Sequence, residues 1–76
     1  MKELIEYIAT SLVDNPGDVQ VREIDNGQGS TLELTVARDD IGKVIGRQGR
    51  TARAMRILLG AASAKAQRRV MLEIQE

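Results

Sequence analysis

Two strand-like segments flank a strong turn signal, and this arrangement constrains the fold more than any other part of the sequence. Residues 31–37, TLELTVA, alternate between aliphatic side chains on one side and threonine or glutamate on the other. Residues 19–25, VQVREID, are rich enough in branched side chains to form a second strand, although their alternation is imperfect. Residues 26–29, Asn-Gly-Gln-Gly, are typical of a tight turn. We therefore expect an antiparallel hairpin with one buried face.

Helical segments are expected on both sides of this hairpin. Residues 3–13 carry one apolar stripe, and the helix is expected to end at residues 14–17, Asp-Asn-Pro-Gly, because proline disfavours helix in the residue before it. After the hairpin, a short helix is expected to end just before Gly46, with Asp39 or Asp40 as its N-cap. The stripe of the first helix consists of Leu4, Ile5, Ile8 and Leu12.

Residues 50–66 predict a longer helix. On a helical wheel, Arg53, Arg56 and Ser63 fall opposite the apolar side. Ile57 falls among the arginines instead of on the apolar side. Three explanations remain open: a stray surface residue, part of a groove wall, or a subunit contact. The expected buried face consists of Ala54, Met55, Leu58, Leu59, Ala62 and Ala66.

The segment after this helix alternates again. Residues 70–75 predict a third strand, and the long helical crossover before it permits parallel pairing with residues 31–37. The order is α-β-β-α-α-β, without a linker or an internal repeat. It favours one α+β domain over residues 1–76, a three-stranded mixed sheet with helices packed on one face.

The composition excludes several classes of function. The 76 residues include neither cysteine nor histidine, so thiolate metal sites, disulfides and the commonest general base are absent. We expect no metal, no cofactor and no enzymatic activity. Tyr7 is the only aromatic residue, which excludes a sheet that stacks bases on aromatic rings. No run approaches the roughly 18 apolar residues of a membrane span, and the first residues do not read as a signal peptide, so we expect a cytoplasmic protein.

Charge is divided unevenly along the chain. Residues 1–40 hold three cations against nine acids, whereas residues 41–76 hold eight cations against two acids. Five of those cations lie between Lys43 and Arg56, where there is no acid. Such asymmetry indicates a polyanion partner, but a solvated face or attraction between the two halves explains it equally well.

The segment 41–50, IGKVIGRQGR, combines glycines with cations. Gly46 and Gly49 permit positive φ and a close approach of backbone to a ligand. The helix that begins near Arg50 directs free N–H groups and the positive end of its dipole at this loop, which favours an anion. The cations around the loop are Lys43, Arg47, Arg50 and Arg53.

Other interpretations of these glycines remain open. The sequence lacks the GK[ST] ending of a P-loop and the spacing of a dinucleotide-binding motif. Gly42 and Gly46 are four residues apart, so Gly42 is explained equally well by a helix-packing notch and by a ligand. Gly46 and Gly49 are also compatible with the corner of a helix-turn-helix module.

The run V-I-G-R-Q-G-R-T-A resembles the KH-domain signature, (V/I)-I-G-x-x-G-x-x-(I/V). The element order is similar to that of type II KH domains, and the likeness covers essentially the entire chain. A KH domain of this length resembles the small bacterial KhpA family. The resemblance implies that the GxxG loop clamps the backbone of single-stranded RNA while an aliphatic groove holds the bases.

Carried over to this chain, the resemblance assigns close phosphate approach to Gly46 and Gly49, and phosphate contact to Arg47 and Gln48. The signature's final Ile or Val is Ala52 here, so one groove wall is expected to be smaller. Together with the charge pattern, the candidate RNA-binding residues are Ile41, Gly42, Lys43, Val44, Ile45, Gly46, Arg47, Gln48, Gly49, Arg50 and Arg53.

The leading hypothesis is a non-catalytic RNA-binding protein, a post-transcriptional regulator or RNA chaperone. The resemblance also implies a homodimer, or a heterodimer with a larger Jag/KhpB-type KH protein. Two alternatives remain: a dimerisation module with incidental nucleic-acid binding, and a DNA-binding helix-turn-helix-like module.

Overall fold

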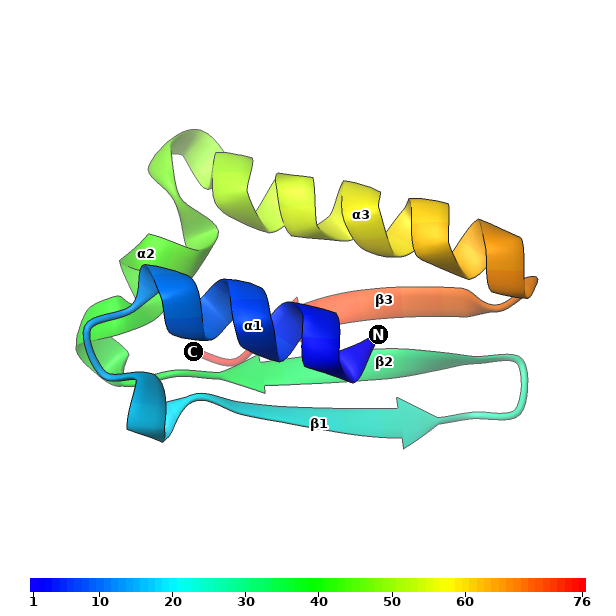
Figure 1. Ribbon diagram of the computed structural model, residues 1–76, viewed down its shortest axis with the longest axis horizontal. Helices are drawn as coiled ribbons and strands as arrows, with labels where there is room; N and C mark the ends of the chain where they lie inside the picture. The colour runs from blue at the N-terminus through cyan, green and yellow to red at the C-terminus, as the bar shows by residue number, and fades with distance from the viewer.

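The computed structural model describes residues 1–76 and contains three α-helices and three β-strands (Figure 1). Single 3₁₀ turns at Pro16–Asp18, Arg38–Asp40 and Arg47–Gly49 connect them. None of the helices has the length and apolar character needed to cross a bilayer. In chain order the elements are α1 (Lys2–Leu12), β1 (Gln20–Asp25), β2 (Gly29–Thr35), α2 (Ile41–Ile45), α3 (Arg50–Ala66) and β3 (Arg69–Ile74).

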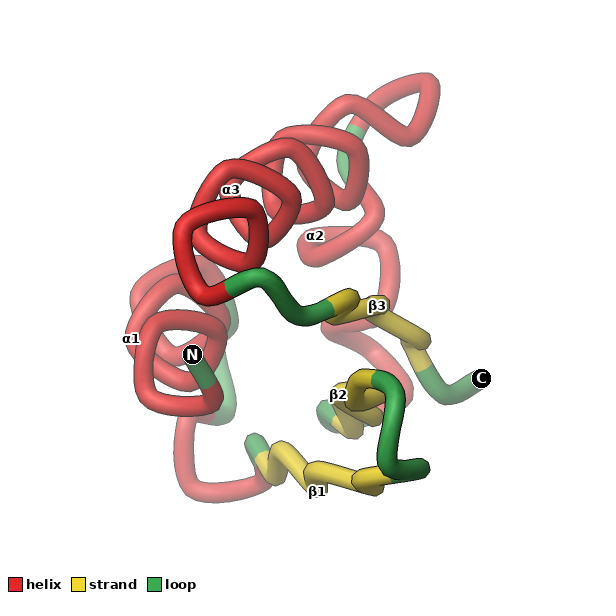
Figure 2. The backbone as a smooth tube through the Cα atoms, turned by 90° about the vertical axis from the view of Figure 1, so that its right-hand side faces the viewer, coloured by secondary structure: helices red, strands yellow, loops and turns green.

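The sheet has the order β1-β2-β3 and is mixed. β1 and β2 form the predicted antiparallel hairpin, in which Val21 lies opposite Leu34. β3 returns after the helical crossover and pairs parallel to β2, with Leu72 beside Leu32. The three helices lie on one side of the sheet, and its other face is uncovered (Figure 2). The predicted α+β arrangement is therefore confirmed.

The core lies between this sheet and the helices. The inward residues of β2 are almost inaccessible, as their clean alternation predicts. From α1, Ile5 and Ala9 are fully buried. Leu4 and Leu12, which were expected in the same stripe, are 37% and 41% exposed, because only the centre of the apolar face meets the sheet. The core consists of Ile5, Ala9, Val21, Leu32, Leu34, Val36, Val44, Met55, Leu59 and Leu72.

The helical wheel placed the buried face of α3 incorrectly. Met55 and Leu59 are buried as expected, but Ala52 and Ser63 complete the stripe. The predictions for Ala54, Leu58 and Ala66 are wrong, since all three are exposed. An alanine gains little from burial, so two leucines and a run of alanines do not fix the rotation of a helix. Ser63 is tolerated inside because its hydroxyl donates to the Gly60 carbonyl at 3.1 Å.

Asp40 is the N-cap residue of α2, as predicted, but its side chain makes no capping hydrogen bond. The carboxylate is fully buried and accepts hydrogen bonds from the segment after α1. The donors are the backbone N–H groups of Asp14 (3.2 Å) and Asn15 (3.0 Å) and the Asn15 side-chain amide (3.0 Å). Asp40 therefore ties the start of α2 to the end of α1.

Candidate functional site

The chain between α2 and α3 turns within a few residues of unusual backbone conformation. α2 ends at Gly46, which has φ 78° and ψ 170°. Gln48 and Gly49 follow with φ 58° and 73°, in the left-handed region. Arg50 then begins α3. Three positive φ values within four residues expose the backbone of the loop, and two of them fall on the glycines that the sequence singled out.

The two loop glycines are required for different reasons. A Cβ on Gly46 would lie 2.2 Å from the Thr51 hydroxyl oxygen and 2.8 Å from the Thr51 backbone nitrogen. Its φ and ψ also belong to a region that is essentially restricted to glycine. A Cβ on Gly49 would meet nothing within 4 Å, so only its left-handed φ favours glycine there. Gly46 therefore holds the loop tightly against the first turn of α3.

The helical path of the backbone is interrupted in the loop. The Gly46 N–H donates to the Gly42 carbonyl at 2.8 Å, and the Gly49 N–H donates to the Gly46 carbonyl at 3.1 Å. Gly46 has an extended ψ of 170°, so the N–H groups of Arg47 and Gln48 do not continue the hydrogen-bond ladder of α2. They lie just ahead of the 17-residue helix α3, whose N-terminal dipole adds positive potential. The loop is thus chemically suited to an anion.

The predicted cations divide into two groups. Arg47, Arg50 and Arg53 are exposed and form no ion pair. Lys43 instead forms ion pairs with Asp14 and, at 3.5 Å, with Asp40. Its hydrogen bond to Asp14 is the main reason that the pKa of Lys43 is raised, and the charges of both aspartates add to the effect. Three arginines, rather than four cations, therefore have charge available for a ligand.

A groove of about 300 Å³ runs beside the loop, between α3 and the open edge of β3. Of the three aliphatic residues expected to form it, only Ile45 lines it. Val44 is fully buried in the core, and Ile41 packs against the core from a partly buried position, so neither forms the groove wall. The lining residues are Ile45, Gly49, Ala52, Arg56, Leu72, Glu73, Ile74 and Glu76.

The far wall of this groove was not anticipated. Leu72 and Ile74 belong to the alternating segment 70–75, but the sequence does not show that this strand runs beside the glycine loop. Ala52 is 4% exposed and lines the groove, at the position where the sequence predicts a smaller wall. Arg56 also lines the groove, although the sequence pointed only to its charge.

Gly42 lies in the middle of the short helix α2 and is exposed. A Cβ at this position would meet no atom within 4 Å, so no other part of the chain packs against it. The helix-packing explanation for Gly42 is therefore wrong within this chain. Because Gly42 has no side chain, the backbone of α2 is exposed here, one turn before the loop.

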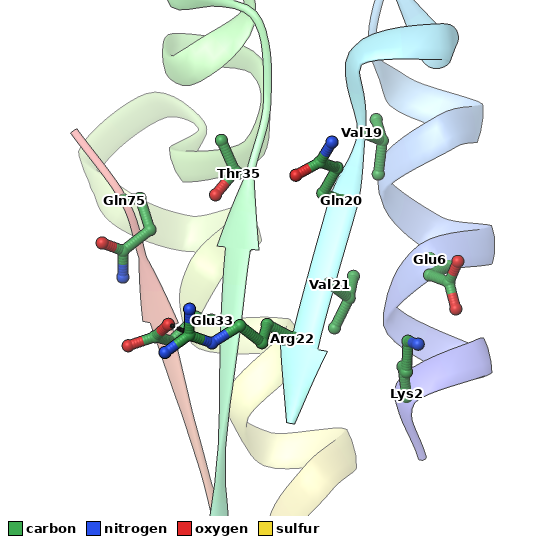
Figure 3. Close-up of a pocket in the computed structure, with 9 residues that line it drawn as sticks. All are labelled: Lys2, Glu6, Val19, Gln20, Val21, Arg22, Glu33, Thr35 and Gln75. Carbon is green, nitrogen blue, oxygen red and sulfur yellow. Dashed lines mark ion pairs between the residues drawn. The ribbon is translucent and has the colours of Figure 1, made fainter. Parts of the chain in front are cut away.

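A larger cavity of about 630 Å³ lies elsewhere, bordered by β1, β2, the residue after β3 and the start of α1 (Figure 3). Its charges are balanced: Lys2 and Arg22 accompany Glu6 and Glu33, and Arg22 pairs with Glu33 at 3.5 Å. Only two of its nine lining residues are hydrophobic. It offers neither a net charge nor an apolar floor, so the loop and the groove beside β3 are the better candidate site.

Comparison with known families decides what kind of domain this is. The sequence profile described as "KhpA/KhpB, KH domain" matches residues 2–74. The chain belongs to this KH-domain family. Its α-β-β-α-α-β order and mixed sheet are those of a type II KH domain.

Relatives match this KH domain over nearly its full length. A protein named "RNA-binding protein KhpA" from Halalkalibacterium halodurans is 55% identical over 74 residues, which cover 97% of each chain. The protein of the same name from Borreliella burgdorferi is 54% identical over 72 residues, 95% of this chain and 88% of the relative. That from Chlamydia pneumoniae is 45% identical over 76 residues, 100% of this chain and 97% of the relative.

A similarity of fold alone extends to a larger protein. A solved structure of Era from Aquifex aeolicus superposes on 96% of this chain with a TM-score of 0.63 and 18% sequence identity. The chain corresponds to 28% of that structure. The α+β arrangement is therefore shared at low sequence similarity.

Proposed function

We propose that this KH domain, spanning residues 1–76, binds single-stranded RNA and acts as a non-catalytic post-transcriptional regulator or RNA chaperone. The observation that carries the proposal is the combination at one loop of two glycines with positive φ, three unpaired arginines and an adjoining, partly aliphatic groove. KH domains use such a loop to clamp a nucleotide backbone. The relatives' name, "RNA-binding protein KhpA", supports it.

In this proposal the parts of the site have separate tasks. Gly46 and Gly49 let the sugar-phosphate chain come close, and the N–H groups of Arg47 and Gln48 donate to phosphate oxygens. The arginines at 47, 50 and 53 supply charge. Bases enter the groove between Ile45 and β3. Three other candidate residues hold α2 in place and do not contact RNA. Lys43 does so through its ion pairs with Asp14 and Asp40, and Val44 and Ile41 do so by packing in or against the core.

RNA is preferred to duplex DNA because of how α3 is placed. A recognition helix of a helix-turn-helix module inserts its first turns into the major groove. Here the first turns of α3 face β3 across a narrow groove, and Ala52 and Met55 are buried against the sheet. Binding of the same sequence as single-stranded RNA and as duplex DNA tests the preference. Tighter binding of the duplex would count against it.

A partner KH protein is a second part of the proposal. On α3, Ile57 and Leu58 are 66% and 48% exposed and stand side by side. Adjacent exposed aliphatics on a helix are suited to a protein contact, so we propose that this surface pairs with a second copy or with a larger Jag/KhpB-type KH protein in the cytoplasm. Sedimentation of the free protein tests self-pairing, and a strictly monomeric mass at micromolar concentration would exclude it.

The salt dependence of binding tests the clamp. Three available arginines correspond to about three neutralised phosphates, and for a single strand the slope of log K against log salt is expected near −2. Fluorescence anisotropy of a labelled oligonucleotide at several salt concentrations measures it. A flat response would show that backbone phosphates are not bound and would favour the dimerisation alternative.

Replacing Gly42 with alanine tests whether RNA contacts this position. Because the position is helical and open, alanine is expected to raise the melting temperature by roughly 2–8 °C. If RNA lies on this exposed backbone of α2, the added methyl group is expected to weaken binding about fivefold or more. Thermal unfolding and anisotropy on the same sample give both values. A more stable variant with unchanged affinity would place RNA away from Gly42.

A further inference from the structure

Arg56, a cation that lines the groove, contacts the backbone of β3. The Arg56 side chain reaches from α3 across the groove to β3, where its Nε and Nη2 atoms both lie 3.4 Å from the Leu72 carbonyl oxygen. Glu73 and Glu76 line the same groove, yet neither forms an ion pair with Arg56. The guanidinium is therefore held by the strand backbone rather than by an acid.

This contact leaves the faces of the guanidinium plane unused. Nε–H and Nη2–H donate within the plane, so the two bonds to Leu72 take one edge of the group. Both bonds are long, at 3.4 Å, and together they direct the donor edge of the group at β3. Arg56 and Arg53 are both exposed, but Arg53 has no such contact. The planar guanidinium of Arg56 thus spans the groove with its donor edge on β3.

Base stacking has no other provider in this groove. Bases that enter a protein groove are commonly stacked on aromatic rings or on arginine planes. The only aromatic residue, Tyr7, is on α1 and 73% exposed, and it does not line the groove. The remaining groove side chains are aliphatic or acidic. Only Arg56 presents a cationic plane to a π-system.

We propose that Arg56 is the base-stacking platform of this site and fixes the position of one base between itself and the wall formed by Ile45 and Ala52. The inference rests on the proposed RNA-binding function and deepens it. Arg56 then differs from Arg47, Arg50 and Arg53: they neutralise phosphates, whereas Arg56 acts on a base. Because purines present the larger π-face, the platform gives the site a purine preference at one position.

The test compares Arg56→Lys with Arg69→Lys on short single-stranded RNA. Lysine keeps the charge and removes the plane. We expect Arg56→Lys to weaken binding about tenfold, which is the scale of one lost base stack, with an unchanged salt slope. Arg69→Lys is the matched control and is expected to stay within about twofold, because Arg69 is exposed on β3, forms no ion pair and does not line the groove. Melting temperatures of both variants establish that each is folded.

A series of RNAs that each lack one base completes the test and does not depend on the variant's stability. In the wild-type protein, removal of the base at the platform position is expected to cost about tenfold. In Arg56→Lys the same removal is expected to cost almost nothing, while removals elsewhere cost the same in both proteins. Equal losses at every position, or unchanged affinity of Arg56→Lys, would overturn the platform and leave RNA binding in place. Absence of wild-type binding to any of the RNAs would overturn both.

Discussion

The double substitution Arg47→Asp with Gln48→Asp is expected to abolish RNA binding and to leave the fold intact. Both side chains are exposed and neither makes a hydrogen bond or an ion pair, so their loss removes no contact within the protein. The change replaces one cation and one neutral group with two carboxylates inside the loop that is proposed to hold phosphate. A carboxylate about 4 Å from a phosphate near a protein surface repels it by up to about 4 kcal/mol, so affinity is expected to fall at least about 100-fold.

A matched control separates the loop from the overall charge. Lys65→Asp with Gln67→Asp makes the same chemical changes at the opposite end of α3, where both residues are also exposed. Gln67 has φ 55°, a left-handed conformation that aspartate accepts. This control is expected to bind within about threefold of the wild type, measured by anisotropy at the same salt. Equal losses in the two double variants would mean that net charge alone governs binding.

Asp40→Ala is expected to cause the largest loss of stability among single substitutions that leave the apolar core untouched. The carboxylate is completely buried and accepts three hydrogen bonds from Asp14 and Asn15. Alanine would leave these donors and the Lys43 ammonium without their buried acceptor. We expect the melting temperature to fall by about 10 °C or more. Asp39→Ala, at the exposed neighbouring position, is the control and is expected to change it little.

The pH dependence of the free energy of unfolding tests the contribution of the Asp40 carboxylate independently. Burial opposes ionisation of Asp40, but the hydrogen bonds from Asn15 and Asp14 and the charge of Lys43 outweigh it and lower the pKa below its ordinary value of 3.8. A lowered pKa stabilises the fold above the ordinary value, and this contribution is lost as the pH falls through the lower, folded-state pKa. Stability is thus expected to decline below about pH 4. Asp40→Asn should flatten that decline, and an unchanged acid profile would contradict the assignment.

Local patterns predicted much of this fold because each was determined by few residues. The clean alternation of residues 31–37 fixed which face of β2 is buried, and the Asn-Gly-Gln-Gly turn fixed the hairpin. Gly46 and Gly49 were recognised from their spacing, and both have positive φ. Where a segment offered weak preferences, as the alanines of α3 do, the sheet decided which side was buried.

The parts that could not be predicted depend on long-range contacts. Asp40 looks like a helix cap in the sequence, and only the return of the chain past Asn15 shows that its carboxylate is a buried acceptor. Lys43 looks available for RNA until its aspartates are seen. The groove wall on β3 arises because parallel pairing with β2 brings Leu72 beside α3, a juxtaposition that no local pattern contains.

The parallel pairing of β3 also governs the order in which the proposed site is completed during synthesis. The loop and α3 precede β3 in the chain, and the ribosome releases residues in that order at about 5–20 per second. A nascent chain therefore presents the arginine-rich loop before Leu72 and Ile74 exist to close the groove and before Leu72 offers its carbonyl to Arg56. Pairing across a long crossover must also wait for the whole crossover to form. During translation the chain can attract a phosphate early, but it can hold a base only after β3 has docked.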